Sequence, residues 1–293
     1  YEMLTPETFN AIVKRAKHHG LPVTAHIPLS MRAGQAAKSG IADMQHLRNL
    51  ETDCVLDGEQ LLNERLEMLK ENAAPNPAAL RGAIHRAQRI NAIRNEDDRR
   101  CRELIATLST NNVSQTPTLI VSRFFSRALF ADPQWRKSYD LLPLPTANNW
   151  RERTKGLLAR KVTADEALFD RWLLSMVRRL DDANVPIMAG TDAPIGFLTP
   201  GLSLHEELAM LVEAGLSPLE ALRAATMTPA AFFGLEKQQG RIAPSMKADM
   251  VVLNANPLVN IRNSMHINAV IKNGRYLNRD ALDQLKGAPA KLK

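Results

Sequence analysis

Two short apolar segments near the start of the chain each end in a histidine. Residues 21–26 end in His26, and residues 41–46 end in His46, twenty positions later. A segment with the spacing of an amphipathic helix precedes each of them. Alternating helices and short apolar strands are typical of βα units, whose strands pair in a parallel sheet that helices cover. The sequence therefore predicts an α/β fold.

The boundaries of the first two predicted helices are marked by turn and capping residues. Thr5 suits the N-cap of the first helix, Pro6 its first turn, and Gly20 its end. The second helix follows Pro28 and ends at Gly40. Both segments are therefore expected to fold as helices that precede or follow a strand of the sheet.

The middle of the chain is less regular. Residues 59–110 have a helical pattern that prolines interrupt, and residues 115–121 form a β-rich run. Residues 122–160 mix aromatic and polar residues without a clear period, whereas residues 168–180 again favour a helix. A long irregular segment of this kind is expected either to cover the mouth of a barrel or to form an oligomer contact.

The last third begins with an apolar strand and ends in a small β module. Residues 185–192 predict a buried strand with Asp192 at its end, and two amphipathic helices follow at 205–214 and 218–226. Ile242 and the segments 249–253 and 267–271 then form β-rich pieces, and Asn273-Gly274 suits a hairpin turn.

Composition excludes several classes of protein. The 293 residues include 38 Lys and Arg and 31 Asp and Glu, a formal charge of +7. Acidic residues are interleaved with the basic ones, without the basic stripe or reading motif of a nucleic-acid binder. No run of about 18 apolar residues predicts a membrane span, and the residues given do not begin with a signal peptide. The sequence does not distinguish a cytoplasmic protein from an exported one.

The chain has two cysteines, Cys54 and Cys101, which do not form a CxxC pair. Two cysteines make no disulfide framework, and we expect both thiols to be small buried residues.

His26, His46 and Asp192 share one position, since each ends a predicted strand. The C-terminal ends of strands in a parallel α/β barrel converge on one face, where catalytic groups collect. Two imidazoles and a carboxylate there suit a metal such as Zn²⁺. A lone histidine is more often a hydrogen-bonded core or surface residue, so the argument rests on the shared position of all three.

The sequence resembles the amidohydrolase superfamily, most of all its imidazolonepropionase-like and Xaa-Pro dipeptidase-like branch. The resemblance is good over residues 1–60 and 180–280 and weak over 61–180. The motifs that carry it are Pro22-Val23-Thr24-Ala25-His26, Gln45-His46, Ala189-Gly190-Thr191-Asp192, Leu204-His205-Glu206-Glu207-Leu208, Glu213-Ala214-Gly215-Leu216-Ser217-Pro218, Gly240-Arg241-Ile242-Ala243-Pro244, Ala248-Asp249-Met250-Val251-Val252-Leu253 and Val270-Ile271-Lys272-Asn273-Gly274.

The resemblance implies a fold and domain boundaries. Residues 1–238 would form the C-terminal part of a TIM-like (β/α)8 barrel, with strands five to eight present here. Residues 239–280 would form part of a small β-sandwich, and 281–293 a tail.

It also implies a metal site. His26 and His46 would be metal ligands, and Asp192 would bind metal and act as general base on a water whose pKa the metal lowers. Zinc is expected, as two divalent ions bridged by a carboxylated lysine upstream of Tyr1. The His-x-His pair of the family's first strand is absent from these residues. We therefore expect a missing N-terminal segment of the same protein to supply the rest of the site.

The implied activity is hydrolysis of an amide bond, in a dipeptide or an N-acyl amino acid, or of an ester bond. A dipeptidase or carboxypeptidase is one form of this activity. Arg48 and His205 are expected to contact a small-molecule or short-peptide substrate, and the protein is expected to be a homo-oligomer. The alternatives are a deaminase or cyclic-amide hydrolase of the same superfamily, or a non-catalytic fragment that lacks half of its metal site.

Overall fold

The structure is a computed structural model that describes residues 2–71 and 76–287. The chain divides into two compact units. Unit 1 comprises residues 1–117 and 164–188, and unit 2 comprises residues 118–163 and 189–293. Each unit is described by itself.

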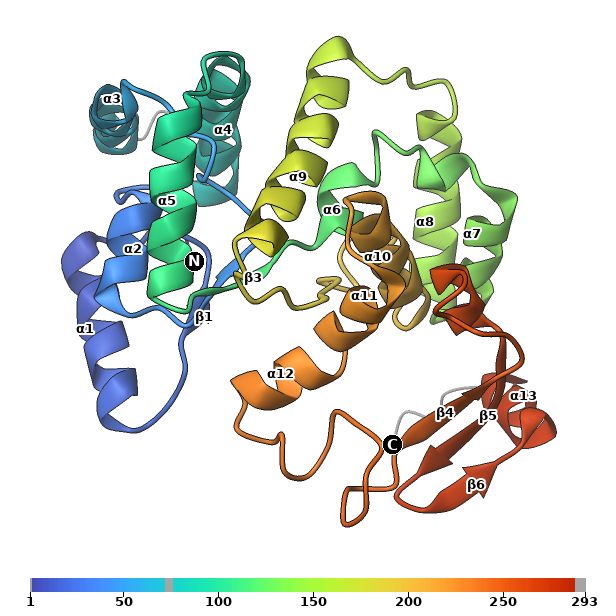
Figure 1. The fold of residues 1–293 in the computed structure, drawn as a ribbon. Helices are drawn as coiled ribbons and strands as arrows, with labels where there is room; N and C mark the ends of the chain where they lie inside the picture. Colours follow the sequence, from blue (N-terminus) through green and yellow to red (C-terminus); the bar gives the residue numbers. More distant parts are fainter. Residues whose placement is uncertain (1, 72–75, 288–293) are drawn as a thin grey trace. The chain divides into compact units, whose positions relative to one another are not determined.

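Unit 1 contains a parallel sheet of three short strands, shown with its helices in Figure 1. They are β1 (Thr24–Ala25), β2 (Asp43–Gln45) and β3 (Ser114–Thr116), paired in the order β1-β2-β3. Gln115 also forms an isolated parallel bridge with Ile187. Four segments therefore lie in parallel register in their chain order, as expected for βα units. Only two or three residues of each of the first three predicted strands pair in the sheet, and the predicted strand 185–192 contributes the single bridge at Ile187.

Helices flank this sheet in the sequence. The helices of unit 1 are α1 (Pro6–His18), α2 (Ala33–Ser39), α3 (Gly58–Glu71), α4 (Pro77–Arg94), α5 (Asp98–Thr110) and α9 (Ala164–Asp182). The predicted start of α1 is confirmed: the hydroxyl of Thr5 accepts the backbone N–H of Thr8 at 3.2 Å, and Pro6 occupies the first turn. Gly20, at φ 66°, follows the helix in the left-handed conformation that glycine favours.

A buried loop follows β2 and is tied to several helices. Nine of the ten residues from 46 to 55 are buried. Side chains of this loop pair with arginines from three different helical segments, in the contacts Arg32–Asp53, Arg65–Thr52 and Arg89–Glu51. The loop that begins at His46 is therefore fixed by tertiary contacts rather than by regular hydrogen bonding.

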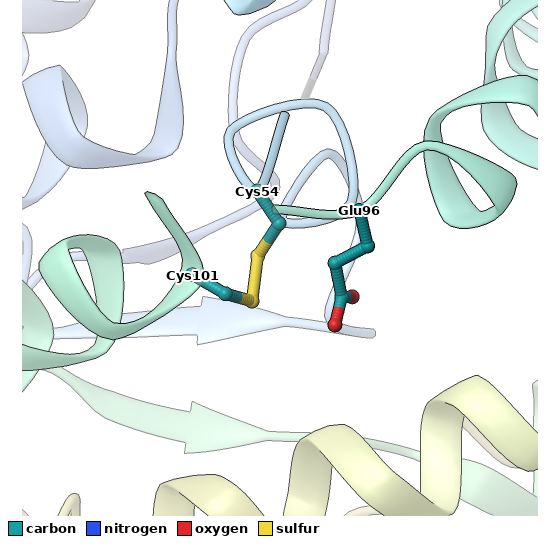
Figure 2. A group of neighbouring side chains, drawn as sticks. All are labelled: Cys54, Glu96 and Cys101. Atoms are coloured by element: carbon teal, nitrogen blue, oxygen red, sulfur yellow. A yellow bond between two sulfur atoms is a disulfide. The ribbon is translucent and has the colours of Figure 1, made fainter. Parts of the chain in front are cut away.

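Cys54, in the same loop, forms a disulfide with Cys101 of α5. Figure 2 shows the bond beside the carboxylate of Glu96. Both cysteines are buried, as expected, but the expectation of separate thiols was wrong. The two cysteines are 47 residues apart in the sequence, and only the packing of α5 against the loop brings their sulfurs together. The disulfide could therefore not be predicted from local sequence signals.

Unit 2 begins with the segment that was expected to be irregular, and that expectation was wrong. It contains α6 (Leu119–Arg123), η1 (Leu129–Ala131), α7 (Pro133–Lys137), η2 (Ser138–Leu141) and α8 (Leu144–Leu157). The short lengths of the first four explain why no helical period is visible in the sequence. The later helices are α10 (Leu202–Glu213), α11 (Pro218–Ala224), α12 (Met227–Phe232), η3 (Ile261–Met265) and α13 (Arg279–Gly287).

Aromatic side chains from residues 118–163 pack around Phe197. Its ring stacks on Phe124 with centroids 5.5 Å apart, and Trp150 lies 5.7 Å away. The indole N–H of Trp135 donates to the backbone carbonyl of Phe197 at 3.1 Å. Residues 118–163 therefore bind the loop that follows Asp192 instead of lying open on the surface.

The predicted β module is an antiparallel sheet in the order β4-β5-β6 (Figure 1). Its strands are β4 (Met250–Leu253), β5 (Ile267–Lys272) and β6 (Arg275–Leu277). The predicted turn at Asn273-Gly274 is confirmed as the β5–β6 hairpin, with Asn273 and Gly274 both at positive φ. Ile242 lies outside any strand and is 84% exposed, so its assignment as a β residue was wrong.

The remaining expectations on architecture stay predictions. The sheet of unit 1 shows an α/β fold, but closure into a (β/α)8 barrel and the identity of strands five to eight are not established by three strands and a bridge. The boundaries at 238/239 and 280/281 likewise remain predictions, and residues 288–293 of the expected tail lie outside the described residues. Among the described residues, none of the helices combines the length and the apolar character that a membrane span requires.

Candidate active site

His26 and His46 converge at the carboxyl edge of the sheet, as the sequence predicted. Each follows its strand by one residue, and the parallel register of β1 and β2 brings the two chain segments side by side. The Nε2 atoms lie 2.9 Å apart, and the ring centroids are 4.7 Å apart at an angle of 74°. The Nε2 atoms of both imidazoles therefore face each other.

The backbone of His46 has a conformation that is uncommon outside glycine. Its φ is 66°, and its N–H donates to the carbonyl of Thr116 at 2.8 Å, which extends the β2–β3 pairing by one step. Burial, with the nearby charges of Arg48 and His26, lowers the pKa of His46 to about 3. The ring is therefore neutral at physiological pH and keeps a lone pair for a metal or a proton donor.

A buried carboxylate lies behind His26. Glu2 is 2% exposed, and its Oε1 lies 3.1 Å from Nε2 of His85. Its Oε2 lies 3.8 Å from Nδ1 of His26, 3.6 Å from Arg48 and 3.3 Å from Arg81. Burial raises the pKa of Glu2, but hydrogen bonding to His26 and His85 and the charge of Arg48 outweigh it, so the pKa lies well below its ordinary value. Glu2 is therefore ionised beside the ring.

A second buried carboxylate lies within the sheet. Asp43 of β2 accepts hydrogen bonds from the hydroxyls of Thr24, at 2.7 Å, and Thr116, at 2.8 Å, and also from the amide of Gln45. Burial raises the pKa of Asp43 to about 6, although these three donors act in the opposite direction. Side-chain hydrogen bonds to Asp43 thus join the three neighbouring strands in addition to the backbone pairing. They lie two to three residues before the histidines in the sequence.

Asp192 belongs to unit 2 and is exposed. Its φ is 52°, so it shares with His46 a left-handed backbone that costs free energy unless the surroundings hold it. Its carbonyl accepts the N–H of Ile195 at 3.0 Å, and Thr191 Oγ1 accepts the N–H of Ala193 at 3.3 Å. A tight turn therefore follows the carboxylate.

His205 and its neighbour contact the η3 segment. Nδ1 of His205 lies 2.9 Å from the hydroxyl of Ser264, and burial lowers the pKa of the ring. Arg262 donates two hydrogen bonds to Glu206, at 2.8 and 3.1 Å. These contacts favour a structural role for the motif around His205, and its expected contact with substrate stays a prediction.

Within the described ranges, one group of three potential metal-binding side chains has its ligand atoms within 4.8 Å of one another: Cys54, Glu96 and Cys101 (Figure 2). The two sulfurs are bonded to each other, and Arg179 and Trp172 donate to the Glu96 carboxylate at 2.7 and 2.6 Å. A disulfide offers no thiolate, so this group is not a metal site in this form.

The pair His26 and His46 fits a divalent metal better. Zinc takes imidazole nitrogens at about 2.0–2.1 Å, which places two such ligands on one ion roughly 3 Å apart. The observed 2.9 Å between the Nε2 atoms is close to that separation. The neutral ring of His46 supplies the lone pair that such a bond requires.

Comparisons with known proteins show what parts of the chain resemble. Residues 141–277 match the model of the amidohydrolase family. An imidazolonepropionase of Geobacillus kaustophilus (strain HTA426) is 36% identical over 107 residues, which make up 35% of this chain and 25% of that protein. Parts of the chain are therefore similar to members of the amidohydrolase superfamily.

Solved structures of other proteins share the fold of this chain. A bottromycin amidohydrolase matches with a TM-score of 0.64 at 20% identity, over 97% of this chain and 56% of that one. A Xaa-Pro dipeptidase with bound methionine matches with a TM-score of 0.56 at 18% identity, over 94% and 49%. The chain thus spans about half the length of these structures.

Sequence reasoning missed the groups behind His26. Glu2 lies ahead of the first helix, and Arg81 and His85 are on α4, in the region where the family resemblance is weak. Arg81 and His85 are four residues apart, so both lie on one face of the helix. This spacing is the one sequence signal that could have indicated a shared contact. Nothing in the sequence indicated that this face meets Glu2.

Proposed function

We propose that this protein is an amidohydrolase that cleaves an amide or ester bond with a metal-activated water, and that His26 and His46 are metal ligands. The observation that carries the proposal is the 2.9 Å approach of the two Nε2 atoms at the carboxyl edge of the parallel sheet. A bound divalent metal, zinc in this proposal and present as two ions, would activate water and polarise the scissile carbonyl. The carboxylated lysine stays a prediction.

The protein's own residues would orient the metal and move protons. The neutral ring of His46 and the ring of His26 would hold one ion. Asp192 would accept a proton from the attacking water and pass it to the leaving group, since an exposed carboxylate suits a general base within hydrogen-bond reach. Its left-handed backbone supports the proposal, because strained residues gather at functional sites.

A substrate with a carboxylate, such as a dipeptide or an N-acyl amino acid, is the class we favour. Arg48 and Arg81 bring two guanidinium groups to the side of His26, with side chains 21% and 33% exposed. Guanidinium groups bind carboxylates through paired hydrogen bonds. The name of the Xaa-Pro dipeptidase among the similar structures points to the same class.

The test is hydrolysis of matched substrates by the purified protein before and after metal removal. Dipeptides and N-acyl amino acids are compared with the same compounds carrying a carboxamide in place of the carboxylate, with lactams and with esters. Turnover that chelation abolishes and Zn²⁺ restores, and that falls when the carboxylate is removed, supports the proposal. Deamination or lactam opening with no dipeptide cleavage contradicts it, as does the absence of bound metal.

A further inference from the structure

A cavity of about 630 Å³ lies beside the disulfide in unit 1. One side of α5 and the C-terminal end of α9 form its walls. The residues that line it include Cys101, Ile105 and Ser109 from the first helix and Arg179 and Asp182 from the second. Its volume is within the range of roughly 300–1,000 Å³ that is usual for pockets that bind small molecules.

The cavity borders one half of the disulfide. Cys101 lines it, whereas Cys54 lies on the buried loop and is not among the described residues that line it. Cys54 is 0% exposed and Cys101 1%, and Figure 2 shows the bond that joins them. Because thiol–disulfide exchange depends on which sulfur a thiol can reach, a thiol that enters the cavity should attack Cys101 and displace Cys54.

A guanidinium group lies next to the sulfur of Cys101. Nη1 of Arg179 donates to this Sγ atom at 3.3 Å. The same guanidinium donates to both oxygens of Glu96, at 2.7 and 3.2 Å, and the indole N–H of Trp172 donates to this carboxylate at 2.6 Å. Glu96 therefore fixes Arg179 beside the sulfur. The attacking species in thiol–disulfide exchange is a thiolate, so a cation at this position favours its approach.

Side chains of both charges line the cavity near Cys101. Asp98 and Arg102 are four residues apart on α5, so they lie on one face of the helix, and both line the cavity. A guanidinium binds a carboxylate, and a carboxylate binds an ammonium group, through charge-assisted hydrogen bonds. The cavity therefore suits a small molecule that carries both a carboxylate and an ammonium group, as amino acids and short peptides do.

We propose that this cavity binds a small zwitterionic thiol, an amino-acid or peptide thiol, and that Cys101 forms a mixed disulfide with it. The thiol loses its proton, and its thiolate attacks Sγ of Cys101. A bond forms between these two sulfurs while the bond between Cys101 and Cys54 breaks. The electron pair leaves with the sulfur of Cys54, which takes up a proton. One thiol is consumed and one is formed, so the incoming thiol is the only co-reactant.

The first experiment incubates the native protein with reduced glutathione, a peptide thiol that carries both charged groups. Mass spectrometry of the intact chain and of its peptides follows the products with time. The expected early product has one glutathione on Cys101 and a free thiol at Cys54, which iodoacetamide labels after excess glutathione is removed and the chain is unfolded. An adduct on Cys54, or reduction to two thiols without an adduct at any time, would overturn the inference.

Cys54→Ala and Cys101→Ala are a matched pair of variants, because each breaks the same disulfide and they differ in the thiol that remains. With oxidised glutathione, native Cys54→Ala should form the mixed disulfide at Cys101. Native Cys101→Ala should stay unmodified until urea unfolds it, since Cys54 does not line the cavity. Equal modification of the two native variants would show that loss of the disulfide exposes either thiol, and would contradict a specific site at Cys101.

The choice of a zwitterionic thiol is tested by comparing glutathione with its dimethyl ester, which lacks the carboxylates, at equal thiolate concentration. The ester should modify the wild type about 10-fold more slowly, the lower end of the effect of charge on association rates. Arg102→Gln should remove this difference. Arg99→Gln, an exposed arginine of α5 that does not line the cavity, should keep it. Equal rates for glutathione and its ester in the wild type would refute the selection of a zwitterion.

Discussion

The Nε2 atoms of His26 and His46 lie 2.9 Å apart, although 20 positions separate the residues in the sequence. The parallel pairing of Thr24 with Asp43 and Ala25 with Met44 produces this approach, because it aligns the ends of the two strands. The separation suits two nitrogens on one ion and also a hydrogen bond between the two rings. A metal ion held by the two rings, as proposed, would therefore require no large rearrangement of the backbone.

Replacing either histidine should abolish tight metal binding. His26→Ala and His46→Ala each remove one of the two nitrogens, and the remaining one should bind Zn²⁺ at least 10- to 100-fold more weakly. Metal content after dialysis measures the effect, and X-ray absorption of the wild type should give metal–nitrogen distances of about 2.0–2.2 Å. His18→Ala, on the exposed end of α1, is the control. Full metal content in both active-site variants would rule out this site.

Asp192→Asn should remove most turnover while the fold is kept. The amide has nearly the same shape but cannot take up a proton, and loss of a general base costs on the order of 10²–10⁴ in rate. The measurement is kcat at equal metal loading, with Asp140→Asn, another exposed carboxylate of unit 2, as the control. Wild-type kcat in Asp192→Asn would show that another group is the base.

Loss of the disulfide should destabilise the fold. The bond closes a loop with a sequence separation of 47 residues, for which the chain-entropy model gives a stabilisation of about 4 kcal/mol. Urea unfolding of Cys54→Ala/Cys101→Ala should show this loss, and dithiothreitol should lower the midpoint of the wild type but not of the double variant. Two thiols reacting in the unreduced, unfolded wild type would contradict the pairing.

The stability of the protein should fall with rising pH because of Glu207. This residue is buried in α10 and accepts the backbone N–H groups of Leu119, at 2.9 Å, and Ile120, at 2.7 Å. Burial raises the pKa of its carboxyl from the ordinary 4.5 to about 8, against the effect of those two donors and of Arg123. The folded state therefore binds the proton more tightly than the unfolded state does.

The contribution of Glu207 is fully present below the unfolded pKa of 4.5 and is lost as pH rises through the folded value of about 8. Glu207→Gln should flatten the slope of unfolding free energy against pH between these limits, measured by urea titration at both ends. Glu152→Gln, an exposed residue of α8, should keep the wild-type slope. An unchanged slope in Glu207→Gln would mean that its pKa is not raised.

The hydrogen bond from Trp135 should hold the loop that follows Asp192. Trp135→Phe keeps an aromatic ring but leaves the carbonyl of Phe197 without its indole donor. The expected loss is about 1–3 kcal/mol of unfolding free energy, the range for an unsatisfied buried acceptor. Trp150→Phe, which keeps a ring against Phe197, should cost less. The idea fails if both variants are equally stable.

The sequence by itself determined the elements with local signals. These signals are the cap and proline of α1, the glycine that ends it, the Asn273-Gly274 hairpin and the two histidines after short apolar strands. Each signal acts on the backbone within a few residues, so the structure it predicts does not depend on distant contacts. The family motifs also indicate His26, His46 and Asp192 as candidate site residues.

The tertiary structure alone decided what lies around these residues. The pairing of Cys54 with Cys101 and the position of Glu2 behind His26, held from α4, join segments 47 to 83 residues apart. The helices between 118 and 163 are too short to show a period, and their aromatic residues are ordered by contact with Phe197. Burial raises the pKa values of Asp43 and Glu207 and lowers that of His46. These shifts also come from packing, because desolvation of a group depends on all the segments that exclude water from it.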